Sequence, residues 1–156
     1  MTLIALVMMI LLGVAVLVAV GAILARRGLP RAPRVTPQQI AAAGPQVFDA
    51  QFWRPGGRAV LSGFGRLTVS GDTLAFQPQD AGGAPFVVSV RAVHARALEG
   101  GVDGSLWLWT PETGDLHGVV SRDYLDRLGS QGPTGLRELR ATAELIEVMR
   151  ALGGRV

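Results

Sequence analysis

The chain has 156 residues, with 15 arginines, no lysine, 12 acidic residues and no cysteine. This length suits one domain of ordinary size, and the lack of cysteine excludes disulfides, thiolate metal sites and a cysteine nucleophile. Four arginines (Arg26, Arg27, Arg31 and Arg34) precede the first acidic residue, Asp49. The rest carries 11 arginines against 12 acids, a formal net charge of −1. A cationic segment therefore precedes a nearly neutral domain, and this distribution argues against a nucleic-acid-binding domain.

The segment from Leu3 to Ala25 contains 23 residues without a charged or strongly polar side chain. At about 1.5 Å per residue a helix of this length spans roughly 34 Å, enough to cross a hydrocarbon core of about 30 Å. A cleaved signal peptide is the alternative, since Ala19 to Ala22 resembles a cleavage site. Such a peptide would have a positive n-region and a shorter apolar run. The sequence therefore predicts one transmembrane helix.

The arginines that follow this segment predict its orientation, because positive residues near a span stay on the cytoplasmic side. We expect a single-pass protein of the plasma (inner) membrane, with the N-terminus outside and the C-terminal domain cytoplasmic. The basic cluster Arg26, Arg27, Arg31 and Arg34 sets this topology. It can also hold the linker on anionic lipid headgroups, at about 1 kcal/mol per residue near the surface. The expected division is 1–27 for the span and its basic flank, 28–45 for a Pro/Gly-rich linker and 46–156 for the soluble domain.

Within the linker, Thr36 and Pro37 predict a helix start, and Gly44-Pro45 ends the helix after about two turns. Beyond it the dominant period is two, which is typical of strands. The sequence from Arg66 to Gln77 predicts a hairpin around Gly71-Asp72. Its expected buried face consists of Leu67, Val69, Leu74 and Phe76.

Further strands are expected on both sides of this hairpin, giving six or seven short antiparallel strands in all. Gly-rich pieces at 63–65 and 82–83 are interpreted as turns. The additional strands are an edge strand at 48–53, a strand at 58–64, one at 86–90 that bends or continues towards Leu98, one at 106–109, and one at 116–120 after a turn at 111–114.

Two helices should follow the strands. Ser121 can cap a short helix over 122–128, and an amphipathic helix is expected over 134–152, ended by Gly153-Gly154. Strands followed by a closing helix predict an α+β domain, a small antiparallel barrel or sandwich.

The segments GRLTVSGDTLAFQP at 65–78 and PFVVSVRAVHARAL at 85–98, a Trp-rich strand and a final amphipathic helix resemble the pleckstrin-homology-like superfamily, in particular its GRAM and bacterial PH branches. The resemblance covers most of residues 57–152. It implies a bent barrel capped by a helix and used for protein or lipid contact. The expected helix at 122–128 departs from the family's pattern.

Trp107 and Trp109 should share one face of their strand, with Leu106 and Leu108 on the other. A strand that is apolar on both faces is usually central, with one side in the core and the other beneath a helix. The alternative is a partner surface, since clustered exposed aromatic side chains mark binding sites.

The candidate chemistry is sparse. His94 and His117 are the only side chains suited to general base catalysis near neutral pH, and Ser121, His117 and Asp115 could be combined into a triad on paper. No nucleophile elbow or metal-binding motif accompanies them, so we expect no catalysis, no metal and no cofactor.

The sequence thus favours a membrane-anchored interaction or scaffold domain that contacts a protein partner or anionic headgroups. The alternatives are a membrane-tethered hydrolase-like enzyme using His117 and an exported β-barrel that binds a small apolar ligand.

Overall fold

The computed structural model describes residues 32–55, 63–79, 81, 83–101, 104–122 and 136–156. These residues form a seven-stranded antiparallel sheet with two α-helices and one 3-10 turn, so the expected small α+β fold is confirmed. The elements are α2 (Pro37–Ala43), β1 (Gln46–Trp53), β2 (Gly63–Ser70), β3 (Thr73–Pro78), β4 (Phe86–Ser89), η2 (Val90–Ala92), β5 (His94–Gly101), β6 (Gly104–Thr110), β7 (Gly114–Ser121) and α3 (Leu136–Ala151).

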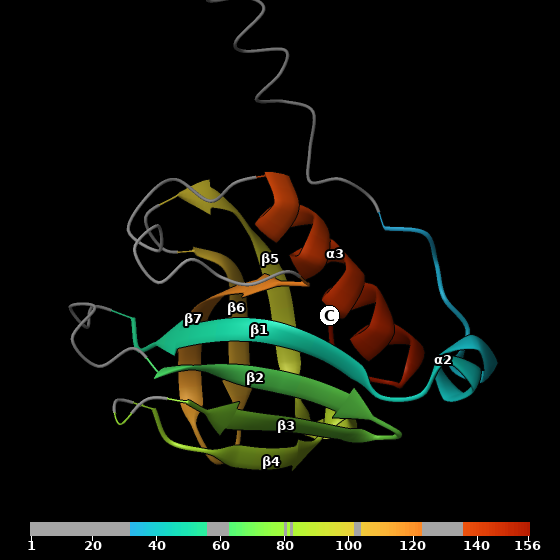
Figure 1. Ribbon diagram of the computed structural model, residues 1–156, viewed down its shortest axis with the longest axis horizontal. Coiled ribbons are helices and arrows are strands. Elements are labelled where there is room, and N and C mark those ends of the chain that lie inside the picture. Colours follow the sequence, from blue (N-terminus) through green and yellow to red (C-terminus); the bar gives the residue numbers. More distant parts are fainter. Residues whose placement is uncertain (1–31, 56–62, 80, 82, 102–103, 123–135) are drawn as a thin grey trace, which may run out of the picture.

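The sheet is strongly curled. Its strand order is β4-β3-β2-β1-β7-β6-β5, so β4 and β5 lie at opposite edges. Nevertheless the short turn η2 joins these two strands directly, which requires the edges to approach each other at that end. Figure 1 shows β1 to β4 crossing in front of β5 to β7, with α3 packed against the curve. No pairing joins β4 to β5 within the described residues, and the sheet is therefore a half-barrel.

The hairpin of β2 and β3 is confirmed. Leu67 pairs with Phe76 and Val69 with Leu74, and all four side chains are buried, as expected from the alternating pattern. Gly71 has a φ of 58°, which suits the first central residue of a type II′ turn.

The expected position of the strand at 48–53 is wrong. It is the central strand β1, paired with β2 on one side and β7 on the other. Phe48, Ala50 and Phe52 are buried on its inner face, while Asp49 and Gln51 lie on the outer face. Strand β7 pairs with β1 although five strands separate them along the chain. The alternating pattern within β1 cannot indicate a partner so distant in the sequence.

The glycines at 63–65 do not form a turn. Gly63 and Gly65 lie within β2, where two other segments approach the backbone closely. A Cβ on Gly65 would lie 2.2 Å from the Gln77 carbonyl oxygen, and one on Gly63 would lie 2.4 Å from Cα of Gly83. These glycines therefore permit close packing of the chain.

Helix α3 contributes one face to the core. Its buried residues belong to the same cluster as Leu106 and Leu108, so the helix covers the inner side of the sheet. They are Ala141, Leu145, Ile146, Val148 and Met149, and the polar residue Thr142 is buried as well. The helix ends as expected at Gly153, whose φ is 89°; the Gly154 amide donates to the Met149 carbonyl at 2.8 Å, a Schellman arrangement.

Helix α2 is also confirmed. Thr36 and Gln39 form a reciprocal capping box, Pro37 is the first helical residue, and Gly44 follows the end. Ile40 is 6% exposed and belongs to the main core, so this short helix packs on the domain that follows it.

Several expectations fall on residues outside the described set. These are the span at 3–25, the arginines Arg26, Arg27 and Arg31, the strand residues 58–62 and the helix residues 123–128. Ser121 is described, and it is the last residue of β7. Within the described residues no helix combines the length and the apolar character needed to cross a membrane.

Candidate functional site

All three tryptophans of the chain lie on the outer face of the sheet. Trp53 of β1, His117 of β7, Trp107 of β6 and Arg96 of β5 are successive cross-strand partners, so they form one row across four strands. Residues directly opposite each other share a face of the sheet. The inward neighbours Phe52, Gly118 and Leu106 are buried, which places the row on the opposite, outer side.

A second row lies beside the first. It consists of Asp115, Trp109 and His94, again as direct cross-strand partners. We call the seven residues of the two rows the tryptophan face. Trp107 and Trp109 are half-buried there, and α3 packs on the other side of the sheet. Of the two sides of this strand, the described helix α3 covers the one with Leu106 and Leu108, and neither described helix covers the one with the two rings.

Neighbouring side chains hold both rings in place. The guanidinium of Arg96 lies 5.0 Å from the centroid of the Trp107 ring, a cation–π arrangement. The indole N–H of Trp107 donates to a carboxylate oxygen of Asp115 at 3.0 Å. The ring of His94 meets Trp109 edge to face, with centroids 5.2 Å apart. These contacts fix the orientation of both rings within the face.

Within the described residues, His117 and Ser121 do not form the catalytic arrangement considered from the sequence. His117 and Ser121 lie four residues apart on one strand, a separation of about 13 Å, so they cannot share a hydrogen bond. Nδ1 of His117 is buried and has no hydrogen-bond partner in the described part of the chain. Nε2 of His94 lies 3.5 Å from Nη1 of Arg155. The triad considered from the sequence is not assembled.

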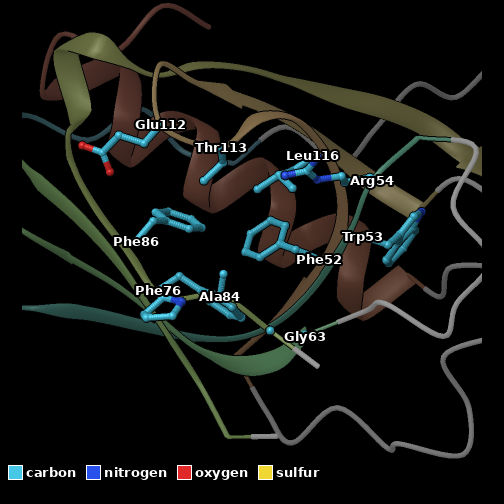
Figure 2. Close-up of a pocket in the computed structure, with 12 residues that line it drawn as sticks. Phe52, Trp53, Arg54, Gly63, Phe76, Ala84, Phe86, Glu112, Thr113 and Leu116 are labelled. Atoms are coloured by element: carbon cyan, nitrogen blue, oxygen red, sulfur yellow. The ribbon is translucent and has the colours of Figure 1, made fainter. Parts of the chain in front are cut away.

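A second feature is a hollow of about 350 Å³ at one end of the half-barrel (Figure 2). Its apolar part comes from inner-face residues of β1, β3, β4 and β7, and its rim comes from three connecting segments. The lining residues are Phe52, Trp53, Arg54, Gly63, Phe76, Gly83, Ala84, Pro85, Phe86, Glu112, Thr113 and Leu116.

Three phenyl rings form the floor of this hollow. Phe52 and Phe76 meet edge to face with centroids 5.1 Å apart, and Phe76 stacks on Phe86 at 5.6 Å. Gly118 makes room for this cluster, because a Cβ there would lie 2.5 Å from the Phe52 ring. The alternating pattern predicts that Phe76 is buried, and a barrel that binds a small apolar ligand is one of the alternatives from the sequence. The pattern does not predict that Phe52 and Phe86 meet Phe76 at this hollow.

Arg34, the described member of the predicted basic cluster, belongs neither to the tryptophan face nor to the lining of the hollow. Arg34 is described and exposed, and its three companions lie outside the described residues. No group of three or more potential metal ligands occurs among the described side chains. Comparison with family models, curated proteins and solved structures finds no match to this chain.

Proposed function

We propose that this chain is a single-pass membrane protein whose folded domain is an interaction module, and that the tryptophan face binds a protein partner. The domain acts as an accessory or scaffold subunit without catalysis of its own. Its place is the cytoplasmic side of the plasma (inner) membrane, with the N-terminus outside. The apolar segment at 3–25 and the arginines after it support this placement.

The observation that carries the proposal is the gathering of Trp53, Trp107 and Trp109 on one side of the sheet. Tryptophan and arginine are enriched among residues that dominate binding energy at protein interfaces. The outer face of an antiparallel sheet is ordinarily polar. Trp53 packs there against the buried side chains of Phe64 and Val119, whereas Trp107 and Trp109 need another explanation. Arg96 and Asp115 beside them supply the hydrogen-bonding groups that orient a partner.

Membership of the pleckstrin-homology-like superfamily is part of the same proposal. The resemblance implies a bent barrel capped by a helix and used for contact with proteins or lipids. A curled antiparallel sheet with α3 packed against it is consistent with that implication.

Photo-crosslinking from single positions tests the partner surface. A benzophenone amino acid replaces Trp109 in one variant of the full-length chain and Trp107 in another, both expressed in the source cells. The matched control replaces Val87, which is 63% exposed on the outer side of β4, at the other edge of the sheet. We expect one protein adduct of the same mass from both tryptophan positions and none from Val87.

Three outcomes would contradict this assignment. These are no adduct from Trp107 and Trp109, equal adducts from Val87, and adducts of lipid alone. Adducts of lipid alone would indicate that the tryptophan face binds anionic lipid headgroups and not a protein.

The topology is tested on the same chain, because it has no cysteine. A cysteine in place of Thr2 should react with a membrane-impermeant maleimide added to intact cells, and one in place of Val156 should react only after lysis. Labelling of the C-terminal cysteine in intact cells would overturn the cytoplasmic placement.

A further inference from the structure

The hollow at the end of the half-barrel goes beyond the proposed partner surface. We propose that it binds a small monocarboxylate with an apolar body. The hydrocarbon lies against Leu116, Ala84 and Pro85, above the floor of buried phenyl rings, and the carboxylate lies on the guanidinium of Arg54. The lining shares one residue, Trp53, with the two rows of the tryptophan face, and its other residues lie outside those rows.

The apolar lining of the hollow indicates that most of the ligand is hydrocarbon. Phe52, Phe76 and Phe86 are each at most 5% exposed, and Leu116 continues the apolar wall on β7. Their packing is already satisfied among themselves, with centroid distances between 5.1 and 6.1 Å. The floor is therefore formed before binding, and a ligand would need to displace only solvent. A hydrocarbon chain or a single aromatic ring is the chemistry that such a floor accepts.

The size of the hollow limits the ligand. Its volume of about 350 Å³ lies near the lower end of the usual range for small-molecule sites, roughly 300–1,000 Å³. Since a water molecule occupies about 30 Å³ in the liquid, the hollow holds about a dozen groups of that size. An acid of about eight to ten carbons matches this volume, and a long-chain lipid does not.

The exposed arginine at the rim of the hollow indicates that the ligand carries a carboxylate. Arg54 is exposed beside the apolar floor, and no hydrogen bond or ion pair involving its side chain occurs in the described part of the chain. A guanidinium in this position presents its planar set of donors to a carboxylate, often through two parallel hydrogen bonds. Figure 2 shows Arg54 and Glu112 on different sides of the hollow. A second negative charge at the far end of the ligand would meet Glu112, so we expect a monocarboxylate.

Photolabelling tests this site on the full-length chain in lipid nanodiscs. The probe is octanoic acid with a diazirine in its chain, the comparison probe is the corresponding alcohol, and labelled positions are mapped by peptide mass spectrometry. We expect saturable labelling by the acid on β1, β3, β4 or β7, and much weaker labelling by the alcohol. Excess octanoic acid should suppress the labelling, and the eight-carbon dicarboxylic acid should not.

Two variants separate the charge from the cavity. Arg54→Gln should lower labelling by the acid about tenfold and leave labelling by the alcohol unchanged. Arg66→Gln, an exposed arginine on β2 outside the lining, is the matched control and should behave like the unaltered chain. Ala84→Phe places a ring at the exposed rim without changing the floor, and should abolish labelling by both probes while the unfolding transition is retained.

Other outcomes would overturn the proposal. Labelling confined to the apolar segment at 3–25 would show partition into the bilayer alone. Labelling of the strands that persists in Ala84→Phe would place the probe elsewhere. Equal labelling by acid and alcohol that is insensitive to Arg54→Gln would exclude the carboxylate site, and preferential competition by a peptide with an apolar C-terminal residue would assign the hollow to a protein terminus.

Discussion

A buried pair of hydroxyl groups connects α3 to the sheet, and its removal gives a sharp test of the packing described above. The hydroxyl oxygens of Ser105 on β6 and Thr142 on α3 lie 2.6 Å apart, and both residues are 0% exposed. Neither hydroxyl can turn to solvent when its partner is lost. Thr142→Val keeps the shape of the side chain and leaves the Ser105 hydroxyl without this partner.

The expected magnitudes differ between the single and double variants. An unsatisfied buried hydroxyl costs about 1–3 kcal/mol, so Thr142→Val should lower the free energy of unfolding by that amount. Ser105→Ala should cost less, because a helical threonine can donate to the carbonyl four residues before it. Replacing both partners removes the polar pair together, and the double variant should lie within about 1 kcal/mol of the unaltered chain.

Urea unfolding followed by tryptophan fluorescence measures these differences, since all three tryptophans lie in the folded sheet. Thr142→Ser is the control, because it retains the hydroxyl and isolates the loss of one methyl group. The reasoning requires a coupling energy of about 1–2 kcal/mol between the two positions. Strictly additive effects of Ser105→Ala and Thr142→Val would refute it, because they would mean that the two hydroxyls do not depend on each other.

Three further changes test other contacts by the same unfolding measurement. Arg122→Ala should lower the free energy of unfolding by about 2 kcal/mol, because it removes a two-bond ion pair with Glu144 at 2.9 and 3.0 Å and a cation–π contact; the exposed Arg140→Ala should change it by less than about 0.5 kcal/mol. Ile40→Ala should cost about 2–5 kcal/mol if α2 packs on the core, and a value near zero would contradict that packing. Gly65→Ala should cost about 1–3 kcal/mol through overpacking against β3, and a neutral result would show that the two strands can separate there.

Local patterns in the sequence predicted the elements whose neighbours are close along the chain. The hairpin around Gly71 follows from alternation and a two-residue turn, and the strand from Leu106 to Trp109 follows from a short apolar run before a turn. The ends of α2 and α3 follow from Thr36 and Gly153, whose side chain or backbone freedom acts within one turn of helix. Because these turns and helix ends depend only on residues close along the chain, they can be predicted from the sequence alone.

Features that depend on distant neighbours were not predictable in this way. The central position of β1 requires pairing with β7, about 70 residues later, and nothing in the sequence from Gln46 to Trp53 specifies that partner. From the sequence, the glycines at 63 and 65 are interpreted as a turn because glycine is common in turns. Their actual role depends on residues 77–83, which approach the backbone of β2 and leave no room for a Cβ. The gathering of Trp53 with Trp107 depends on the same long-range pairing, and only the register of the strands brings His117 between them.

The end of β1 joins the two candidate surfaces through consecutive residues. Because side chains alternate along a strand, Phe52 forms the floor of the hollow while Trp53 belongs to the tryptophan face, and Arg54 follows at the rim. Trp53 is also among the residues that line the hollow. If both proposals hold, a ligand that orders the rim would act on the residue that precedes Arg54 and borders the partner surface. By reciprocity, a partner bound to the tryptophan face and a carboxylate bound in the hollow would change each other's affinity by the same factor. Under these two proposals, regulation of partner binding by a ligand would act through three adjacent residues, Phe52 and Trp53 at the end of β1 and Arg54 after it.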